Sequence, residues 1–211
     1  IERSLEASLA RLGLDRVDVA LVHDPDNHYE QAREGAFPAL RKLRAAGVIG
    51  AIGAGMNQSE MLERFVRETD VDCVLVAGRY SLLDDRATVS LLPACAEHGV
   101  GVLVGGVFNS GILARPEPGA YFDYRPANTR LLSRAQKLRE VVRAHGVSLA
   151  AAAIQFPARD ERVTTVAVGA RSAAEVQQDI GHFTTLIPDA LWSDLQSSGL
   201  LGWRDLPTGD A

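Results

Sequence analysis

The sequence is poor in the residue types that mark several classes of protein. Only two of its 211 residues are cysteine, Cys73 and Cys95, and both stand in apolar surroundings. This usage is typical of buried, reduced thiols and does not indicate a disulfide framework. No apolar run approaches the ~20 residues that a helix needs to cross a bilayer, and no N-terminal stretch resembles a signal peptide. We therefore expect a cytoplasmic protein with no membrane-spanning segment.

The sequence also lacks an excess of positive charge. Its 22 Lys and Arg residues stand against 27 Asp and Glu residues, which gives a net charge of −5. Basic and acidic residues are interspersed, so no basic patch is apparent that would attract nucleic acid or an anionic membrane. We expect neither as a partner, and the composition leaves the oligomeric state open.

The chain opens without a start methionine and without a helix cap. Leu5, Leu9 and Leu12 recur at helical spacing soon after Ile1. The residue before the expected helix is Ile1, which has no side-chain oxygen to accept hydrogen bonds from the first turn. The pattern reads as a helix that has already begun, so we expect an N-terminally truncated chain.

Apolar runs typical of buried strands alternate with amphipathic helical patterns. The expected strands are residues 17–22, 48–53, 71–76, 100–104 and 163–168. A helical pattern follows each strand, which predicts a parallel α/β fold. No Gly-rich dinucleotide turn follows an early strand, so we favour a segment of a (β/α) barrel over a doubly wound sheet. No linker is apparent, and we expect one domain over residues 1–211.

The helical patterns differ in how clearly they begin and end. They cover residues 2–12, 29–46, 59–69, 86–98, 131–145, 148–157, 173–183 and 189–199. We expect Asn57 or Ser59 to cap the third of them. Residues 114–129 form the longest stretch with no expected structure, and loops of this length in compact domains are typically functional or mobile.

His23 directly follows the first expected strand, at the end where barrels place their chemistry. Three interpretations of this residue are open. The imidazole donates a proton or a hydrogen bond to a substrate oxygen. It ligates a metal together with Asp24, Asp26 and His28, as in a metal-dependent hydrolase. Or it simply ends a strand, and the two aspartates belong to the turn.

Residues after the later strands suggest a nucleotide ligand. The ring of Tyr80 is suited to stacking on a flat heteroaromatic ring, or to packing at the rim. Glycines at 105–106 permit close backbone approach to a phosphate. Residues 169–172 place Arg171 and Ser172 at an expected helix N-terminus, where barrel enzymes bind phosphate. Alternatively, Ser172 is only the N-cap of that helix.

Six segments, in collinear order, resemble the aldo-keto reductase superfamily. They are residues 8–18, 21–26, 52–57, 79–84, 107–113 and 169–172. They span almost the whole chain, which makes the resemblance far more specific than any one motif. Residues 53–57 and 77–80 look most like the D-threo-aldose 1-dehydrogenase branch, which includes L-fucose and galactose dehydrogenases.

The resemblance implies a parallel (β/α)8 TIM barrel, of which this chain carries about the last five βα units. It also implies an oxidoreductase that uses NAD or NADP and no metal. Such an enzyme transfers a hydride between the anomeric carbon of an aldose and nicotinamide, giving the lactone. Two alternatives are an aldo-keto reductase of another carbonyl substrate, such as pyridoxal, and a non-catalytic cofactor-binding subunit. The expected partner is then a small sugar or carbonyl compound.

The resemblance also implies roles for individual residues. His23 matches the histidine of an Asp-Tyr-Lys-His tetrad whose other members precede Ile1, so we expect residues 1–211 alone to be inactive. Tyr80 matches the aromatic that stacks on the nicotinamide, and Arg171 a position beside the adenosine ribose. The implied cofactor-binding residues are Asn57, Tyr80, Val107, Phe108, Asn109, Ser110, Gly111, Leu113, Gly169, Arg171, Ser172, Gln178 and Asp179.

Two positions depart from the pattern of the family. Ala77 stands where many members have Gln, and residues 55–56 are Gly-Met where many have Ser-Asn. We therefore expect this chain to make fewer hydrogen bonds to a nicotinamide carboxamide than many members of the family do. Only Asn57 offers an amide at this place.

Overall fold

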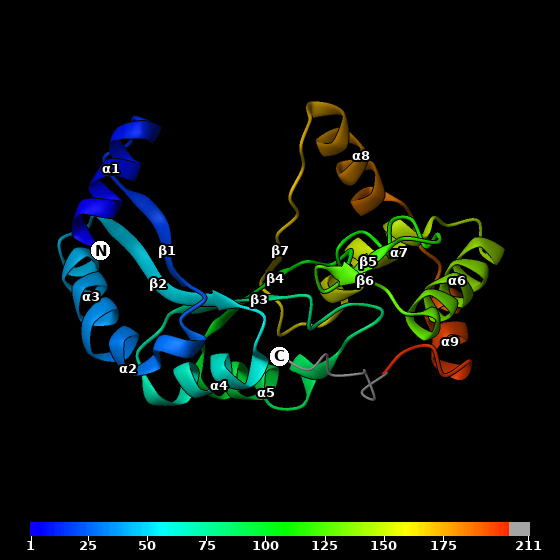
Figure 1. The fold of residues 1–211 in the computed structure, drawn as a ribbon, viewed down its shortest axis with the longest axis horizontal. Coiled ribbons are helices and arrows are strands. Elements are labelled where there is room, and N and C mark those ends of the chain that lie inside the picture. Colours follow the sequence, from blue (N-terminus) through cyan, green and yellow to red (C-terminus); the bar gives the residue numbers. More distant parts are fainter. Residues whose placement is uncertain (203–211) are drawn as a thin grey trace.

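Five parallel strands form the central sheet of the computed structural model, which describes residues 1–202 (Figure 1). In spatial order they are β1 (Val17–His23), β2 (Ile49–Met56), β3 (Cys73–Ala77), β4 (Gly101–Gly105) and β7 (Thr165–Val166). Each strand pairs in parallel with the next, so the predicted parallel α/β fold is confirmed. Within residues 1–202 the sheet does not close on itself. The single domain expected over residues 1–211 extends past the described residues.

Helices follow the strands along the chain, as the alternating pattern predicts. They are α1 (Glu2–Leu12), α2 (Tyr29–Gln31), α3 (Phe37–Ala45), α4 (Ser59–Glu68), α5 (Leu91–His98), α6 (Thr129–Ala144), α7 (Leu149–Gln155), α8 (Ala173–Thr184) and α9 (Asp189–Ser197). Figure 1 shows α2 to α5 along one side of the sheet, and α6, α7 and α9 gathered at the end opposite α1. Among the helices of residues 1–202, none has the length and apolar character to cross a membrane.

Two apolar clusters hold these elements together. The first packs the strands against α3, α4 and α5, with Ile52, Leu62 and Leu91 fully buried. The second lies among α6, α7 and α9. Phe108 and Phe156 are half-buried and pack against both clusters. The loop after β4 is therefore fixed by the core on two sides, and this loop carries much of the predicted cofactor site.

The helix expected over residues 29–46 is interrupted by a wider turn. Between α2 and α3 the residues Ala32–Ala36 form a π-helical turn. Pro38 lies in the first turn of α3 and has no backbone N–H to continue the regular hydrogen-bond ladder. The chain therefore stays helical through Pro38 because the turn just before it is a wider, π-helical one.

The predicted cap of α4 is wrong. Gln58 occupies the N-cap position and makes no capping hydrogen bond from its side chain. Its amide instead donates to the carboxylate of Asp26 at 3.0 Å. Ser59 is buried as the first residue of the helix, one position too late to act as a cap.

The stretch with no expected structure contains a short hairpin. Strands β5 (Tyr121–Phe122) and β6 (Arg125–Pro126) pair antiparallel within residues 114–129. Its two-residue tip, Asp123 and Tyr124, has positive φ values of 51° and 62°, as tight hairpins require. The usual sequence signal is Asn-Gly or Asp-Gly at the tip. Neither dipeptide is present here, so the sequence pattern does not predict the hairpin.

We predict that Gly53 is essential for the contact between β2 and β3. A Cβ at Gly53 would collide with the carbonyl oxygen of Cys73 and lie 2.9 Å from Leu21 Cδ2. Gly53→Ala should lower the free energy of unfolding by about 1–3 kcal/mol, because a paired backbone has little room to move. The control is Gly55→Ala, whose Cβ would meet its nearest neighbour, Leu75 Cβ, at 3.5 Å. Urea denaturation compares the two, and equal midpoints would contradict the prediction.

Candidate functional site

The carboxyl ends of the strands form one rim. His23 is the last residue of β1 and pairs with Gly55 of β2. The residues directly after β2, β3 and β4 are Asn57, Gly78 and Gly106. The parallel register brings these three strand ends together, so residues far apart in the sequence share one edge of the sheet.

The His23 side chain lies open at this rim. It is 87% exposed, and its Nδ1 is 3.4 Å from a carboxylate oxygen of Asp24. The backbone N–H of Asp24 donates to the carbonyl of Gly55 at 2.9 Å, which fixes the backbone of Asp24 beside His23. The imidazole is thus oriented on one side and accessible to a ligand on the other.

The alternative metal site does not form. Across the described residues 1–202, no three His, Cys, Asp or Glu side chains group as a metal ion would require. Asp26 accepts a hydrogen bond from Gln58 instead of sharing a ligand position with His23. Alternate residues of a tight turn point apart, which explains the separation.

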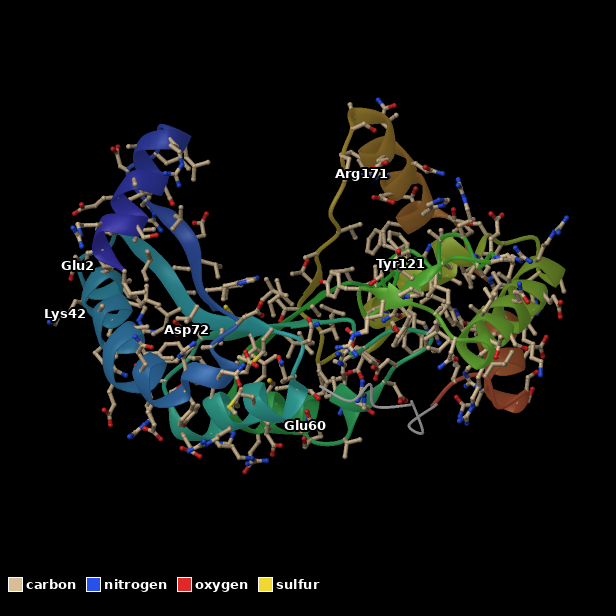
Figure 2. All side chains as sticks on the ribbon, viewed as in Figure 1. Glu2, Lys42, Glu60, Asp72, Tyr121 and Arg171 are labelled. Carbon is tan, nitrogen blue, oxygen red and sulfur yellow. The ribbon has the colours of Figure 1, made fainter. Side chains whose placement is uncertain are left out.

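A large groove brings six of the predicted cofactor-binding residues together. Its volume is about 1010 Å³, and it lies between α6, the start of α7 and α8; we call it the α8 groove. The six are Phe108, Gly111, Gly169, Arg171, Gln178 and Asp179. Figure 2 shows Arg171 where the chain enters α8, at one end of this groove.

The α8 groove also contains basic residues that sequence reasoning missed. Arg115, Arg139 and Arg143 line it. Arg139 and Arg143 are four positions apart, so they lie on one face of α6. This spacing was the only feature of the sequence that could have indicated their role. Guanidinium groups bind phosphate oxygens well, so the chemistry of the groove fits the phosphates of a dinucleotide cofactor.

The start of α8 carries an ion pair. Arg171 donates to the Glu175 carboxylate from its backbone N at 2.7 Å and from Nη2 at 3.1 Å. These hydrogen bonds, the backbone one first, hold the pKa of Glu175 below its ordinary value. Ser172 caps the helix by accepting from the N–H of Glu175 at 3.2 Å, so the capping interpretation of Ser172 is confirmed. Its expected contact with a cofactor stays a prediction.

A smaller recess lies where β2, β3 and β4 end. Its volume is about 30 Å³, and we call it the rim recess. It is lined by Asn57, Ala77, Gly78, Gly106, Asn109, Ser110, Asp123 and Tyr124. Three of these are predicted cofactor-binding residues, Asn57, Asn109 and Ser110. The last two of the eight belong to the unexpected hairpin.

Three of the predicted residues serve the loop rather than an open surface. The buried amide of Asn109 donates to the carbonyl of Gly78 at 3.1 Å and accepts from the hydroxyl of Ser81. The side chains of Val107 and Leu113 are buried in the two apolar clusters. These side chains fix the path of the loop, while Phe108 and Gly111 of the same loop line the α8 groove and Ser110 lines the rim recess.

Tyr80 lies outside both the α8 groove and the rim recess. The residue is 6% exposed, and its ring packs against Phe156 at a centroid distance of 5.3 Å. Its hydroxyl donates to Asp160 at 3.1 Å, and burial together with this carboxylate raises the pKa of Tyr80. The buried ring also lines a pocket together with Phe156 and Arg162, and its expected stacking on nicotinamide stays a prediction. A tyrosine at a strand end gives no sequence signal that separates packing from stacking.

Two known proteins with similar sequences are dehydrogenases. The chain is 43% identical over 204 residues to D-threo-aldose 1-dehydrogenase from Pseudomonas sp, covering 95% of this chain and 62% of that protein. It is 40% identical over 212 residues to pyridoxal 4-dehydrogenase from Microbacterium luteolum, with the same coverage of 95% and 62%. The chain therefore spans less than two thirds of the length of these relatives.

A solved structure and a family model agree with these similarities. The fold matches the apo form of aldo-keto reductase AKR11C1 from Bacillus halodurans with a TM-score of 0.74 and 25% identity. The match covers 97% of this chain and 70% of that one. The model of the aldo/keto reductase family matches residues 1–199. With the strand order, the rim and the α8 groove in place, this match shows that the chain belongs to the aldo/keto reductase family.

Proposed function

We propose that this chain forms the rim of an aldose 1-dehydrogenase that uses a nicotinamide dinucleotide. The observation that carries the proposal is the α8 groove, in which six residues expected to bind a cofactor line one cavity. Its arginines supply the positive charge that a pyrophosphate needs. The 43% identity to D-threo-aldose 1-dehydrogenase supports an aldose as the substrate.

His23 is the residue of this rim that acts on the sugar. Oxidation of an anomeric alcohol to a lactone removes a hydride from the carbon and a proton from the hydroxyl. A bound nicotinamide would supply the hydride acceptor. His23 holds the anomeric oxygen by a hydrogen bond, and Asp24, 3.4 Å away, limits the orientation of the ring. This contact fixes the anomeric carbon relative to the α8 groove.

The acidic residues of the α8 groove favour NAD over NADP. Glu175 already engages the guanidinium of Arg171, and Asp179 lines the same groove. A 2′-phosphate near Arg171 would meet these two carboxylates and be repelled. Ribose hydroxyls would instead donate hydrogen bonds to a carboxylate, as in other NAD sites.

A second candidate function is oxidation of pyridoxal. The 40% identity to pyridoxal 4-dehydrogenase favours it, and it needs the same cofactor groove and the same hydrogen bond from His23. The two candidates differ only in the shape of the substrate at the rim.

We also propose that the protein works in the cytoplasm. Both cysteines are free and buried, and burial raises the pKa of Cys95 to about 11. Thiols with raised pKa values remain protonated and react slowly, as suits a reducing compartment.

Substrate oxidation by the full-length protein, including any residues before Ile1, tests the proposed function. We expect NAD to be reduced with L-fucose and D-arabinose, and more slowly with pyridoxal, measured by the absorbance of NADH. Rapid oxidation of pyridoxal without sugar oxidation would support the second candidate instead. Binding of NAD with no turnover of any of these compounds would indicate a non-catalytic cofactor-binding subunit.

We predict that His23→Ala lowers kcat/KM for the sugar by about 100-fold or more, the usual range for a group that assists proton transfer. The dissociation constant for NAD should stay unchanged, because His23 does not line the α8 groove. His28→Ala is the matched control, since His28 lies in the turn after the rim. Steady-state kinetics and NADH fluorescence titration measure the two quantities. Equal losses in both variants would exclude this role.

We predict that Glu175→Gln shifts cofactor preference toward NADP. Removal of one negative charge near a 2′-phosphate should tighten NADPH binding about tenfold relative to NADH. Because the pKa of Glu175 is lowered, its carboxylate stays charged between about pH 6 and pH 8, well above the ordinary Glu value, so titration of Glu175 contributes no change of preference in this range. Glu140→Gln on the exposed surface of α6 is the control. An unchanged ratio of dissociation constants would show that Glu175 does not face the ribose.

A further inference from the structure

Most of the rim recess offers no polar side chain to a ligand. Ala77, Gly78 and Gly106 line it and carry no polar side-chain atom. The amide of Asn109 is engaged at both ends, since its Nδ2 donates to the carbonyl of Gly78 at 3.1 Å and its Oδ1 accepts from the hydroxyl of Ser81. The polar contacts of a ligand in the recess therefore come mainly from the other residues that line it.

Asn57 is one of these residues. It directly follows β2 and lines the recess. Within residues 1–202, no other described residue hydrogen-bonds its side-chain amide. The amide therefore has both its N–H donors and its oxygen acceptor left for a ligand.

Asp123 also lines the recess, from the tip of the β5–β6 hairpin, whose first strand begins at Tyr121 (Figure 2). Arg79 donates from Nη2 to both carboxylate oxygens of Asp123, at 3.1 and 3.0 Å. Arg79 is itself largely buried beside the fully buried side chain of Asp84, so this ion pair fixes Asp123 in place. A carboxylate has about four acceptor sites, and the Asp123 side chain is 40% exposed. It therefore keeps acceptor sites for a ligand.

Strained backbone surrounds the same recess. Four non-glycine residues that line it have left-handed φ values: Asn109 at 44°, Ser110 at 57°, Asp123 at 51° and Tyr124 at 62°. Within residues 1–202, Asp24 is the only other non-glycine residue of this kind. The backbone N–H of Tyr124 donates to the hydroxyl of Ser110 at 3.0 Å, which ties the hairpin tip to the loop after β4. Strained residues held in this way gather at ligand contacts.

The loop of residues 106–113 connects the recess with the α8 groove. Phe108 and Gly111 line the groove, whereas Asn109 and Ser110 line the recess. A dinucleotide with its pyrophosphate in the groove can extend along this loop and bring its nicotinamide end to the recess. About 30 Å³ holds one water-sized group and no ring. The nicotinamide ring then stays outside, and only its carboxamide reaches in.

We propose that Asp123 is a cofactor-binding residue that accepts a hydrogen bond from the carboxamide NH₂ of nicotinamide, while the amide of Asn57 donates to the carboxamide oxygen. The two side chains supply the acceptor and the donor that a carboxamide needs. A hydrogen bond to a carboxylate is stronger than one to a neutral oxygen, and a carboxylate repels a second one. Asp123 thus selects a carboxamide over an acid or a ketone on the ring. This inference rests on the proposed nicotinamide cofactor and adds the residue that recognises its ring substituent.

Three dinucleotides that differ only in this substituent test the inference in the full-length protein. They are NAD, its 3-acetylpyridine analogue, which has a methyl group in place of the NH₂, and nicotinic acid adenine dinucleotide, which has a carboxylate. The wild type should bind the acetylpyridine analogue about tenfold more weakly than NAD, because Asp123 then lacks its donor. It should bind the acid analogue more weakly still, because two carboxylates repel each other. Isothermal titration calorimetry measures all three dissociation constants without turnover.

Two variants that suit a backbone with positive φ remove the carboxylate. Asp123→Gly should bind NAD and the acetylpyridine analogue with dissociation constants within about twofold of each other. Asp123→Asn, also tolerated at this φ, should bind the acid analogue at least about tenfold more tightly than the wild type does, because its amide donates to the carboxylate. Glu117→Gln is the matched control, since Glu117 is an exposed acid of the same loop that does not line the recess. Thermal melting checks that each variant is folded.

The ratios of the dissociation constants separate recognition from a structural role. If Asp123 only held the hairpin, Asp123→Gly would weaken all three dinucleotides by the same factor, and this result overturns the inference. Equal binding of NAD and the acetylpyridine analogue by the wild type also overturns it and leaves the proposed function standing. A preference for NAD that is lost in Asp123→Gly but kept in Glu117→Gln supports the inference even if no sugar is oxidised. Failure of the wild type to bind any of the three overturns both.

Discussion

The site depends on one constraint, the in-register parallel pairing of β1, β2, β3 and β4. Parallel pairing puts all carboxyl ends at the same edge, and the register aligns His23 with Gly55 and Ala77 with Gly105. A shift of one residue in any strand would move its rim residue away from the others and turn its buried side chains outward. The close approach at Gly53, where a side chain would strike the backbone of β3, helps to keep this register. The positions of the rim residues therefore depend on packing within the strands, several residues before the rim.

Sequence reasoning predicted the strands and the rim because both depend on periodicity. A buried parallel strand is a continuous apolar run, and the residues directly after it lie at the carboxyl edge, so His23 and Asn57 could be placed without a structure. Tyr80 could not be placed in this way. Its burial depends on Phe156, which is distant in sequence, and no local pattern encodes that contact. The hairpin was missed for a different reason, since Asp123 and Tyr124 adopt a turn that glycine usually occupies.

Charge is balanced locally within the α8 groove. Arg139 and Arg143 line one side with no ion pair to another described residue, whereas Arg171 on the opposite side is held by Glu175. Free guanidinium groups attract phosphates, and a neutralised one does not add to that attraction. This arrangement of charge supports the proposal that a pyrophosphate binds along the groove. It also supports the proposal of NAD over NADP, because an extra phosphate at the α8 end would meet a guanidinium that is already paired.

One loop joins the two parts of the site. Residues 106–113 place Phe108 and Gly111 in the α8 groove and Asn109 and Ser110 in the rim recess. The loop cannot relax at one end alone, because Asn109 bonds to Gly78 and Phe108 packs against both apolar clusters. Strain in Asn109 and Ser110 is therefore maintained by the core and not by a ligand. A site held in this way is already shaped before a ligand arrives, and binding need not supply the energy to form it.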